Sequence, residues 1–180
     1  MKDLVVRSYA KINICLNVNE RRGDGFHNLD MVMVPIELHD SLLISELKNA
    51  TNNFVTIDDF SNGNVHYNLA SSALTLIEQK YHLKNRFRVL IHKSIPMQAG
   101  LGGGSSNAAF VLKGVNKILK LNAKENELVE IAKQLGSDVP FFISCKPARC
   151  QGTGDDLENI TIKNNYFVLL VKPNEGCSTK

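Results

Sequence analysis

Residues 96–109 read Pro-Met-Gln-Ala-Gly-Leu-Gly-Gly-Gly-Ser-Ser-Asn-Ala-Ala, and four of the five positions from Gly100 to Gly104 are glycine. The run follows a strand-like segment, Phe87 to Ile91, and opens a helix-like segment that continues to about Leu119. Glycine lets a backbone turn tightly and approach a ligand closely. Successive amide N–H groups ahead of a helix suit an anion such as phosphate. The sequence therefore predicts a phosphate-binding loop, and a glycine-rich surface turn is the alternative.

Two common phosphate signatures do not fit this run. The pattern Gly-x4-Gly-Lys-Ser/Thr needs a lysine after its last glycine, whereas Gly104 is followed by Ser105. The dinucleotide pattern Gly-x-Gly-x-x-Gly also fails, because its sixth position falls on Ser105 when counted from Gly100 and on Asn107 when counted from Gly102. The loop is therefore expected to hold phosphate in a different way.

The bulk composition indicates a globular protein. A chain of 180 residues with 43% hydrophobic residues predicts one domain, or one domain and a fragment. No apolar run is long enough to span a membrane, and the charged segment Met1–Arg7 does not resemble a secretory signal, so we expect a cytoplasmic protein with no membrane partner. A net charge of +3 is too mild to indicate nucleic-acid binding. Nothing in the composition sets an oligomeric state.

The four cysteines, Cys15, Cys145, Cys150 and Cys177, show no Cys-x2-Cys spacing. Two of them, at positions 145 and 150, could supply two zinc ligands, but no second pair accompanies them. Isolated reduced thiols are the favoured interpretation.

Apolar periodicity and turn residues place the other elements. We expect a helix beginning at the cap Asn68, a helix over about 123–135 in which Asn122 and Glu125 form the cap, and a short helix that contains Pro140. One or two strands are expected within 31–45, with an interruption near Pro35 and His39-Asp40, and further strands at 5–18, 54–58, 87–91 and 166–172.

Two charged residues stand out against this background. Lys11 lies inside an apolar strand and shares a face with Asn13, and its charge must reach water or a partner. A lysine that extends to solvent from an edge strand is the alternative. Asp138 directly precedes Val139-Pro140, where it could simply cap a short helix.

The glycine-rich run resembles the ATP-binding motif of the superfamily of galactokinase, homoserine kinase, mevalonate kinase and phosphomevalonate kinase (the GHMP kinases). Three other segments narrow the resemblance to the 4-diphosphocytidyl-2-C-methyl-D-erythritol kinase family: Ala10-Lys11-Ile12-Asn13, Arg22-Gly23-Asp24-Gly25-Phe26-His27 and Ser137-Asp138-Val139-Pro140-Phe141. Phe26 stands where that family usually has tyrosine. The phenyl ring keeps the π-face that stacks on a base and loses only the hydroxyl.

The resemblance implies a site and its ligands. Lys11 and Asp138 would be the catalytic pair, with the aspartate as the base. Asn13, Phe26 and His27 would hold the cytidine diphosphate end of a small-molecule substrate, and ATP with Mg²⁺ would be the other ligand. Ser106, with Ser105 as the second candidate, could contact a phosphate or the metal through its hydroxyl, and the metal ligands are not identified. The implied ATP-binding residues are Asn68, Pro96, Met97, Gln98, Ala99, Gly100, Leu101, Gly102, Gly103, Gly104, Ser105 and Ser106.

The implied fold is a mixed α+β domain like ribosomal protein S5 domain 2. Residues 1–158 would form the N-terminal ATP-binding and catalytic domain, and residues 159–180 would begin a truncated second domain. The resemblance covers about the first half to two thirds of a family member, and the second glycine-rich motif of the superfamily is absent. Three functions remain open: the 2-hydroxyl kinase of the isoprenoid precursor pathway, another GHMP kinase, and an inert fragment or ligand-binding module.

Overall fold

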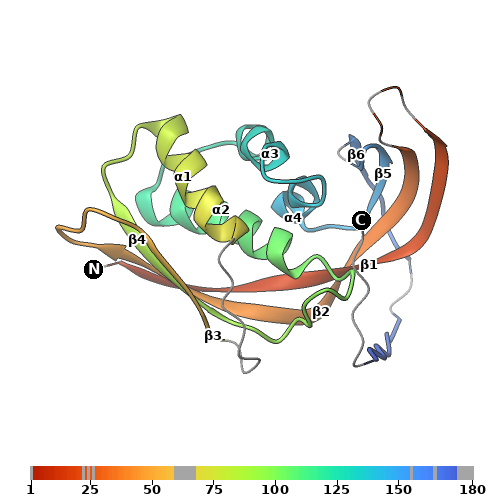
Figure 1. The fold of residues 1–180 in the computed structure, drawn as a ribbon, viewed down its shortest axis with the longest axis horizontal. Helices are drawn as coiled ribbons and strands as arrows, with labels where there is room; N and C mark the ends of the chain where they lie inside the picture. Colours follow the sequence, from red (N-terminus) through yellow and green to blue (C-terminus); the bar gives the residue numbers. More distant parts are fainter. Residues whose placement is uncertain are drawn as a thin grey trace.

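The computed structural model describes residues 2–21, 23, 25, 27–58, 68–154, 156–163 and 166–173. Within these residues, helices cover one face of a curved six-stranded sheet, as Figure 1 shows. The predicted mixed α+β class is therefore confirmed. The strands are β1 (Asp3–Arg21), β2 (His27–Leu47), β3 (Phe54–Asp58), β4 (Arg86–His92), β5 (Ala148–Gly152) and β6 (Asp156–Asn159), and the helices are α1 (Leu69–Tyr81), α2 (Gly103–Leu119), α3 (Glu125–Lys133) and α4 (Val139–Ser144).

The long strand β2 is the centre of the sheet. β1 pairs with it along one edge, while β4 and β5 pair with separate stretches of its other edge. β3 runs parallel to β4, and β6 runs antiparallel to β5. The expected interruption near Pro35 is a register shift between Tyr9 and Ala10 within a continuous strand pair, after which Lys11 lies opposite Pro35. An irregularity of this kind tolerates proline, which lacks a backbone donor.

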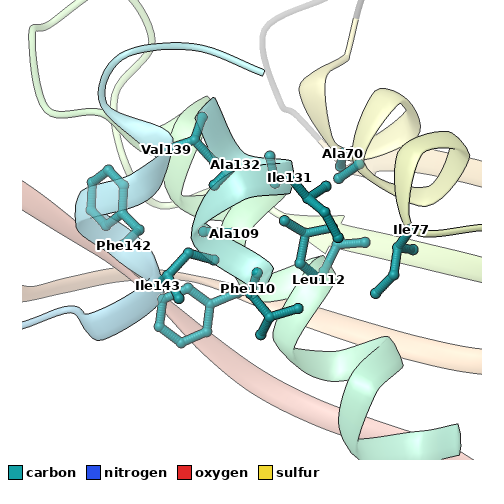
Figure 2. Close-up of a cluster of buried hydrophobic side chains, with 14 of the residues drawn as sticks. Ala70, Ile77, Ala109, Phe110, Leu112, Ile131, Ala132, Val139, Phe142 and Ile143 are labelled. Atoms are coloured by element: carbon teal, nitrogen blue, oxygen red, sulfur yellow. The ribbon is translucent and has the colours of Figure 1, made fainter. Parts of the chain in front are cut away.

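Helix α2 lies at the middle of the helical layer. Its residues Ala109 and Leu112 are fully buried, and in Figure 2 they lie among side chains from the other three helices. Those neighbours are Ala70 and Ile77 of α1, Ile131 and Ala132 of α3, and Val139, Phe142 and Ile143 of α4. Close packing of its buried residues against these helices holds α2 in one position, so its first turn is fixed as well.

Two predicted helix boundaries are confirmed and one cap is wrong. The Asn68 side chain accepts a hydrogen bond from the Ala70 amide at 2.9 Å, and α2 ends at Leu119. At α3 the cap is not made by Asn122, which has a positive φ of 56°. The Glu127 carboxylate instead accepts the Lys124 amide at 2.9 Å, because the helix begins later than the sequence pattern indicated.

The predicted strand over 166–172 is wrong. These residues have no regular secondary structure, and their large apolar side chains, including Phe167 and Leu169, are exposed. A strand is stabilised by hydrogen bonds to a neighbour, and no strand in the described ranges pairs with this segment. The proposed boundary between residues 158 and 159 stays a prediction. Of the helices described, none is long and apolar enough to cross a membrane.

Candidate active site

A cavity of about 420 Å³ opens at the start of α2. Eleven of the twelve residues that the sequence assigned to ATP line it, and only Ser106 does not. Ile57, Leu69, Lys93 and Asn107 also line the cavity and were not predicted. Ile57 lies in β3 and Leu69 in α1. Because both are apolar, the sequence does not distinguish them from residues of the hydrophobic core. The cavity combines an apolar wall with a glycine-rich backbone wall.

The backbone at Gly102 explains why glycine is needed there. Its φ is +69°, a left-handed conformation that side chains disfavour. A Cβ at this position would lie 2.8 Å from Phe142 Cζ and 3.2 Å from Lys11 Cγ. The loop therefore packs directly against α4 and β1, which brings the start of α2 close to the Lys11 side chain.

The first turn of α2 presents amide groups toward an anion site. The Ser106 amide donates to the Gly102 carbonyl at 2.8 Å, and this is the first hydrogen bond of the helix. The amides of Gly103, Gly104 and Ser105 come before it and have no acceptor within the helix. All three residues line the cavity. Together with the positive end of the helix dipole, these amides favour a phosphate group.

Ser105 and Ser106 have different surroundings. Ser105 is half-buried and lines the cavity. Ser106 is fully buried, and its hydroxyl lies 2.7 Å from the Ser8 hydroxyl on β1. Ser8 also donates to the Asn107 amide oxygen at 2.8 Å. The Ser106 hydroxyl, which the sequence favoured as the ligand contact, is thus engaged between β1 and α2. Ser105 is instead the serine that lines the cavity.

Lys11 and Asp138 lie far apart in the sequence and are brought together by the fold. The Lys11 ammonium lies 3.6 Å from an Asp138 carboxylate oxygen, and the lysine is only 6% exposed. Asp138 has a helical backbone conformation and makes no capping hydrogen bond to α4, which removes the simple explanation for an acidic residue there. About a third of its side chain is exposed, so the carboxylate is accessible to a ligand.

The Lys11 backbone and side chain connect this pair to the loop. Its amide donates to the Leu101 carbonyl at 3.0 Å, and Leu101 lines the cavity. Its ammonium also donates to the Asn13 amide oxygen at 3.2 Å. The pair, the Asn13 side chain and the glycine loop therefore form one continuous region. A cation beside a carboxylate next to an anion cavity suits proton removal from an alcohol and transfer of a phosphoryl group.

The residues expected to hold a cytidine group are only partly described. His27 is the first residue of β2 and is exposed, whereas Phe26 lies outside the described residues. The β1–β2 hairpin that carries His27 curves toward the side of the sheet where β5 and β6 lie (Figure 1). His27 lies opposite Arg21, whereas Asn13 lies opposite Met33, so these two residues predicted to hold the cytidine diphosphate end lie at different places along one hairpin.

The described residues contain no cluster of three or more His, Cys, Asp or Glu side chains that could hold a metal ion. Mg²⁺ in phosphoryl-transfer sites usually keeps several waters and binds through substrate phosphates and one or two protein oxygens. The Ser105 hydroxyl and the Asp138 carboxylate are oxygen donors beside the loop. These residues fit a magnesium ion that arrives with a nucleotide.

A thiol lies near the charged pair. Cys150 of β5 is fully buried, and burial raises its pKa to about 11, with a backbone hydrogen bond at Met33 opposing the rise and the Asp138 charge adding to it. Only a thiolate is a strong nucleophile, so this thiol does not act as a base or nucleophile near neutral pH.

The cysteines should differ in their reactivity toward iodoacetamide. Near neutral pH the thiolate fraction of Cys150 should be about a hundredfold below that of an ordinary thiol, because each pKa unit is a tenfold effect. Cys15 is exposed, and burial raises the pKa of the half-buried Cys145. Peptide mapping by mass spectrometry should find alkylation first at Cys15 and last at Cys150. Equal rates at the two positions would contradict the buried placement of β5.

Comparison with known proteins gives the class of fold. Residues 68–146 match the family described as the GHMP kinases N terminal domain. The solved mevalonate kinase of Methanococcus jannaschii matches with a TM-score of 0.68 at 13% identity, over 90% of this chain and 57% of that one. This likeness supports the fold alone. The chain therefore has the fold of the N-terminal domain of the GHMP kinases, and residues 68–146 match the model of that domain.

The more similar proteins carry one particular name. A 4-diphosphocytidyl-2-C-methyl-D-erythritol kinase of Bacillus cytotoxicus is 39% identical over 98% of this chain and 61% of its own length. A kinase of the same name from Caldicellulosiruptor saccharolyticus is 33% identical, also over 98% of this chain and 61% of its own length. The crystal structure of a 4-(cytidine 5'-diphospho)-2C-methyl-D-erythritol kinase matches with a TM-score of 0.74 at 31% identity, over 88% of this chain and 56% of that chain. The chain therefore spans about three fifths of the length of these relatives.

Proposed function

We propose that this chain carries the ATP-binding and catalytic part of a kinase that phosphorylates the 2-hydroxyl of 4-diphosphocytidyl-2-C-methyl-D-erythritol. The observation that carries the proposal is the Lys11–Asp138 pair, 3.6 Å apart, directly beside the glycine loop. The names of the relatives at 33–39% identity support the choice of substrate. The three described cysteines are free thiols, which agrees with a reducing compartment such as the cytoplasm.

In the proposed reaction the nucleotide phosphates bind at the first turn of α2. The amides of Gly103, Gly104 and Ser105 donate to phosphate oxygens, and the Ser105 hydroxyl adds a further donor. Apolar side chains such as Ile57 and Leu69 form the cavity wall that is suited to a flat base. A bound Mg²⁺ ion would supply charge neutralisation between the phosphates.

Proton transfer and charge stabilisation fall to the pair from β1 and α4. The Asp138 carboxylate accepts the proton of the substrate hydroxyl as its oxygen attacks the terminal phosphorus. The bond from that phosphorus to the bridging oxygen breaks, and ADP leaves with the electron pair. The Lys11 ammonium, which donates to the Asn13 side chain, offsets negative charge on the transferring group, while the Lys11 backbone amide anchors β1 to the loop.

A transfer assay with several alcohols tests the proposed function. The chain is incubated with ATP and Mg²⁺, and with the cytidine-bearing alcohol, methylerythritol phosphate, mevalonate or homoserine in turn. Because the chain spans about 61% of the length of the Bacillus cytotoxicus relative, the same assay is run on a version extended with the C-terminal part of that relative. Phosphorylation of the cytidine-bearing alcohol alone is expected. Preference for mevalonate or homoserine would indicate another GHMP kinase, and binding without transfer by either version would indicate a binding module.

The base pocket provides a separate prediction. Stacking of a base on an aromatic ring contributes about 1–3 kcal/mol, so Phe26→Ala should weaken binding of the cytidine-bearing alcohol by about tenfold to a hundredfold. Phe26→Tyr should be neutral or slightly better, and ATP affinity should not change in either variant. Calorimetric titration with each ligand measures these effects. Weaker ATP binding with unchanged binding of the alcohol would mean that the two ends of the site are reversed.

A further inference from the structure

Asp40 is a carboxylate with no exposed surface at the centre of the sheet, and neither the sequence motifs nor the proposed mechanism uses it. One of its oxygens accepts the amides of Ser94 and Ile95, each at 2.8 Å. The other accepts the Lys93 ammonium at 2.5 Å. A buried carboxylate is costly unless it is fully paired. These three partners are the three consecutive residues that join β4 to the glycine loop, so Asp40 fixes that connection.

Lys93 connects this buried charge to the cavity. Its side chain is only 10% exposed, yet the residue lines the cavity. Its ammonium lies 3.1 Å from the position that a Cβ on Gly103 would take, which places it at the first residue of α2. An ammonium has three N–H donors, and the contact with Asp40 uses one.

A lysine at the start of a helix is electrostatically unfavourable on its own, because the helix dipole is positive there. The Asp40 carboxylate offsets that repulsion in this structure. An anion placed beside the Gly103 amide would be attracted by the ammonium, the amides and the dipole together. The environment of Lys93 thus favours a bound phosphate over an empty site.

We propose that Lys93 is a nucleotide-binding residue whose ammonium donates to a phosphate oxygen of the nucleotide, and that Asp40 is the positioning residue that holds it. This inference rests on the proposed binding of ATP at the start of α2. Asp40 acts through Lys93 and through the chain segment that it fixes, and it does not touch the nucleotide. The competing explanation is that Lys93 and Asp40 form a buried ion pair that only stabilises the fold.

Binding measurements with ATP, ADP, AMP and adenosine separate the two explanations. Lys93→Met should weaken the binding of ATP and ADP by about tenfold to a hundredfold, the usual effect of losing a hydrogen bond to a charged group. The affinity for adenosine should change by less than about threefold. Lys93→Arg should retain most of the ATP affinity. Lys133→Met, which removes an exposed lysine paired with Glu130 on α3, is the matched control and should bind all four ligands like the unaltered chain.

Asp40→Asn tests the positioning role. Asp40→Asn should weaken the binding of ATP more than the binding of adenosine. Because the two residues act as one unit, its effect on ATP affinity should not add to that of Lys93→Met in the double variant. Thermal unfolding verifies that each variant is folded. If Lys93→Met does not fold, the double variant Asp40→Asn/Lys93→Met leaves no unpaired buried carboxylate and provides the same comparison.

The outcomes distinguish this inference from the proposed function. If Lys93→Met lowers the affinities for ATP and adenosine equally, or lowers neither, the proposed phosphate contact is wrong. The Lys93–Asp40 pair would then only stabilise the fold. An unaltered chain that binds adenosine and ATP equally would also overturn the proposed phosphate contact. Failure of the unaltered chain to bind any of the four ligands would overturn the proposed function itself, and this inference with it.

Discussion

Asp138→Asn should lower the rate of phosphoryl transfer by about 10² to 10⁴, the usual contribution of a general base. The substitution keeps the size of the side chain but removes the carboxylate that we propose as the acceptor of the hydroxyl proton. It also removes the negative partner of the Lys11 ammonium, which lies 3.6 Å away. Because the cavity is formed mainly by other segments, ATP affinity should change little. Single-turnover kinetics and nucleotide titration on the same preparation measure both effects.

Asp156→Asn is the matched control for this prediction. Asp156 is exposed on β6, and the same change there should leave the transfer rate within about twofold, as surface substitutions usually do. If Asp138→Asn transfers phosphate at a rate near that of the unaltered protein, the aspartate is not the base.

Gly103→Val should reduce ATP affinity by about a hundredfold or more, because several charge-assisted hydrogen bonds to phosphate would be lost together. A Cβ on Gly103 would lie 3.1 Å from both the Lys93 ammonium and Ile95 Cγ2, and the rest of the valine side chain would occupy the space before the first amides of α2. The effect does not depend on backbone conformation. In this loop the left-handed glycines are Gly100 and Gly102.

Gly114→Ala separates loss of binding from loss of stability. Gly114 lies in the middle of α2, where an added Cβ would collide with Ile44 Cδ1 of β2. Overpacking of this kind should lower the free energy of unfolding by about 1–3 kcal/mol, without affecting the ATP affinity of the folded protein. Calorimetry and denaturant unfolding on both variants provide the comparison. Unchanged ATP affinity in Gly103→Val would mean that the glycines serve only to turn the chain.

Sequence patterns predicted the elements that are fixed by interactions between residues close together in the chain. Asn68 could be assigned as a cap because its side chain satisfies an amide only two residues away. The extent of α2 followed from its buried stripe, and the glycine loop followed from the absence of side chains between Gly102 and Gly104. The proximity of Lys11 and Asp138 came from family resemblance, since no periodicity links positions so far apart.

The features that sequence reasoning missed depend on distant partners. Asp40 and Lys93 carry no local signal in the sequence, because their contact joins β2 to the residue that follows the neighbouring strand β4. The burial of Ser106 depends on Ser8 of β1, which no local pattern indicates. The opposite error occurred at 166–172, where a strongly strand-like sequence has no neighbouring strand among the described residues. A strand requires a partner as well as a composition.

We propose that the loop at the start of α2 and the Lys11–Asp138 pair form one site for phosphoryl transfer. A crystal structure with a non-hydrolysable ATP analogue, Mg²⁺ and the cytidine-bearing alcohol tests it most directly. We expect nucleotide phosphates at the amides of Gly103, Gly104 and Ser105, and the substrate hydroxyl within about 2.6–3.2 Å of the Asp138 carboxylate. Phosphates bound away from the start of α2, or a hydroxyl that faces away from Asp138, would contradict it.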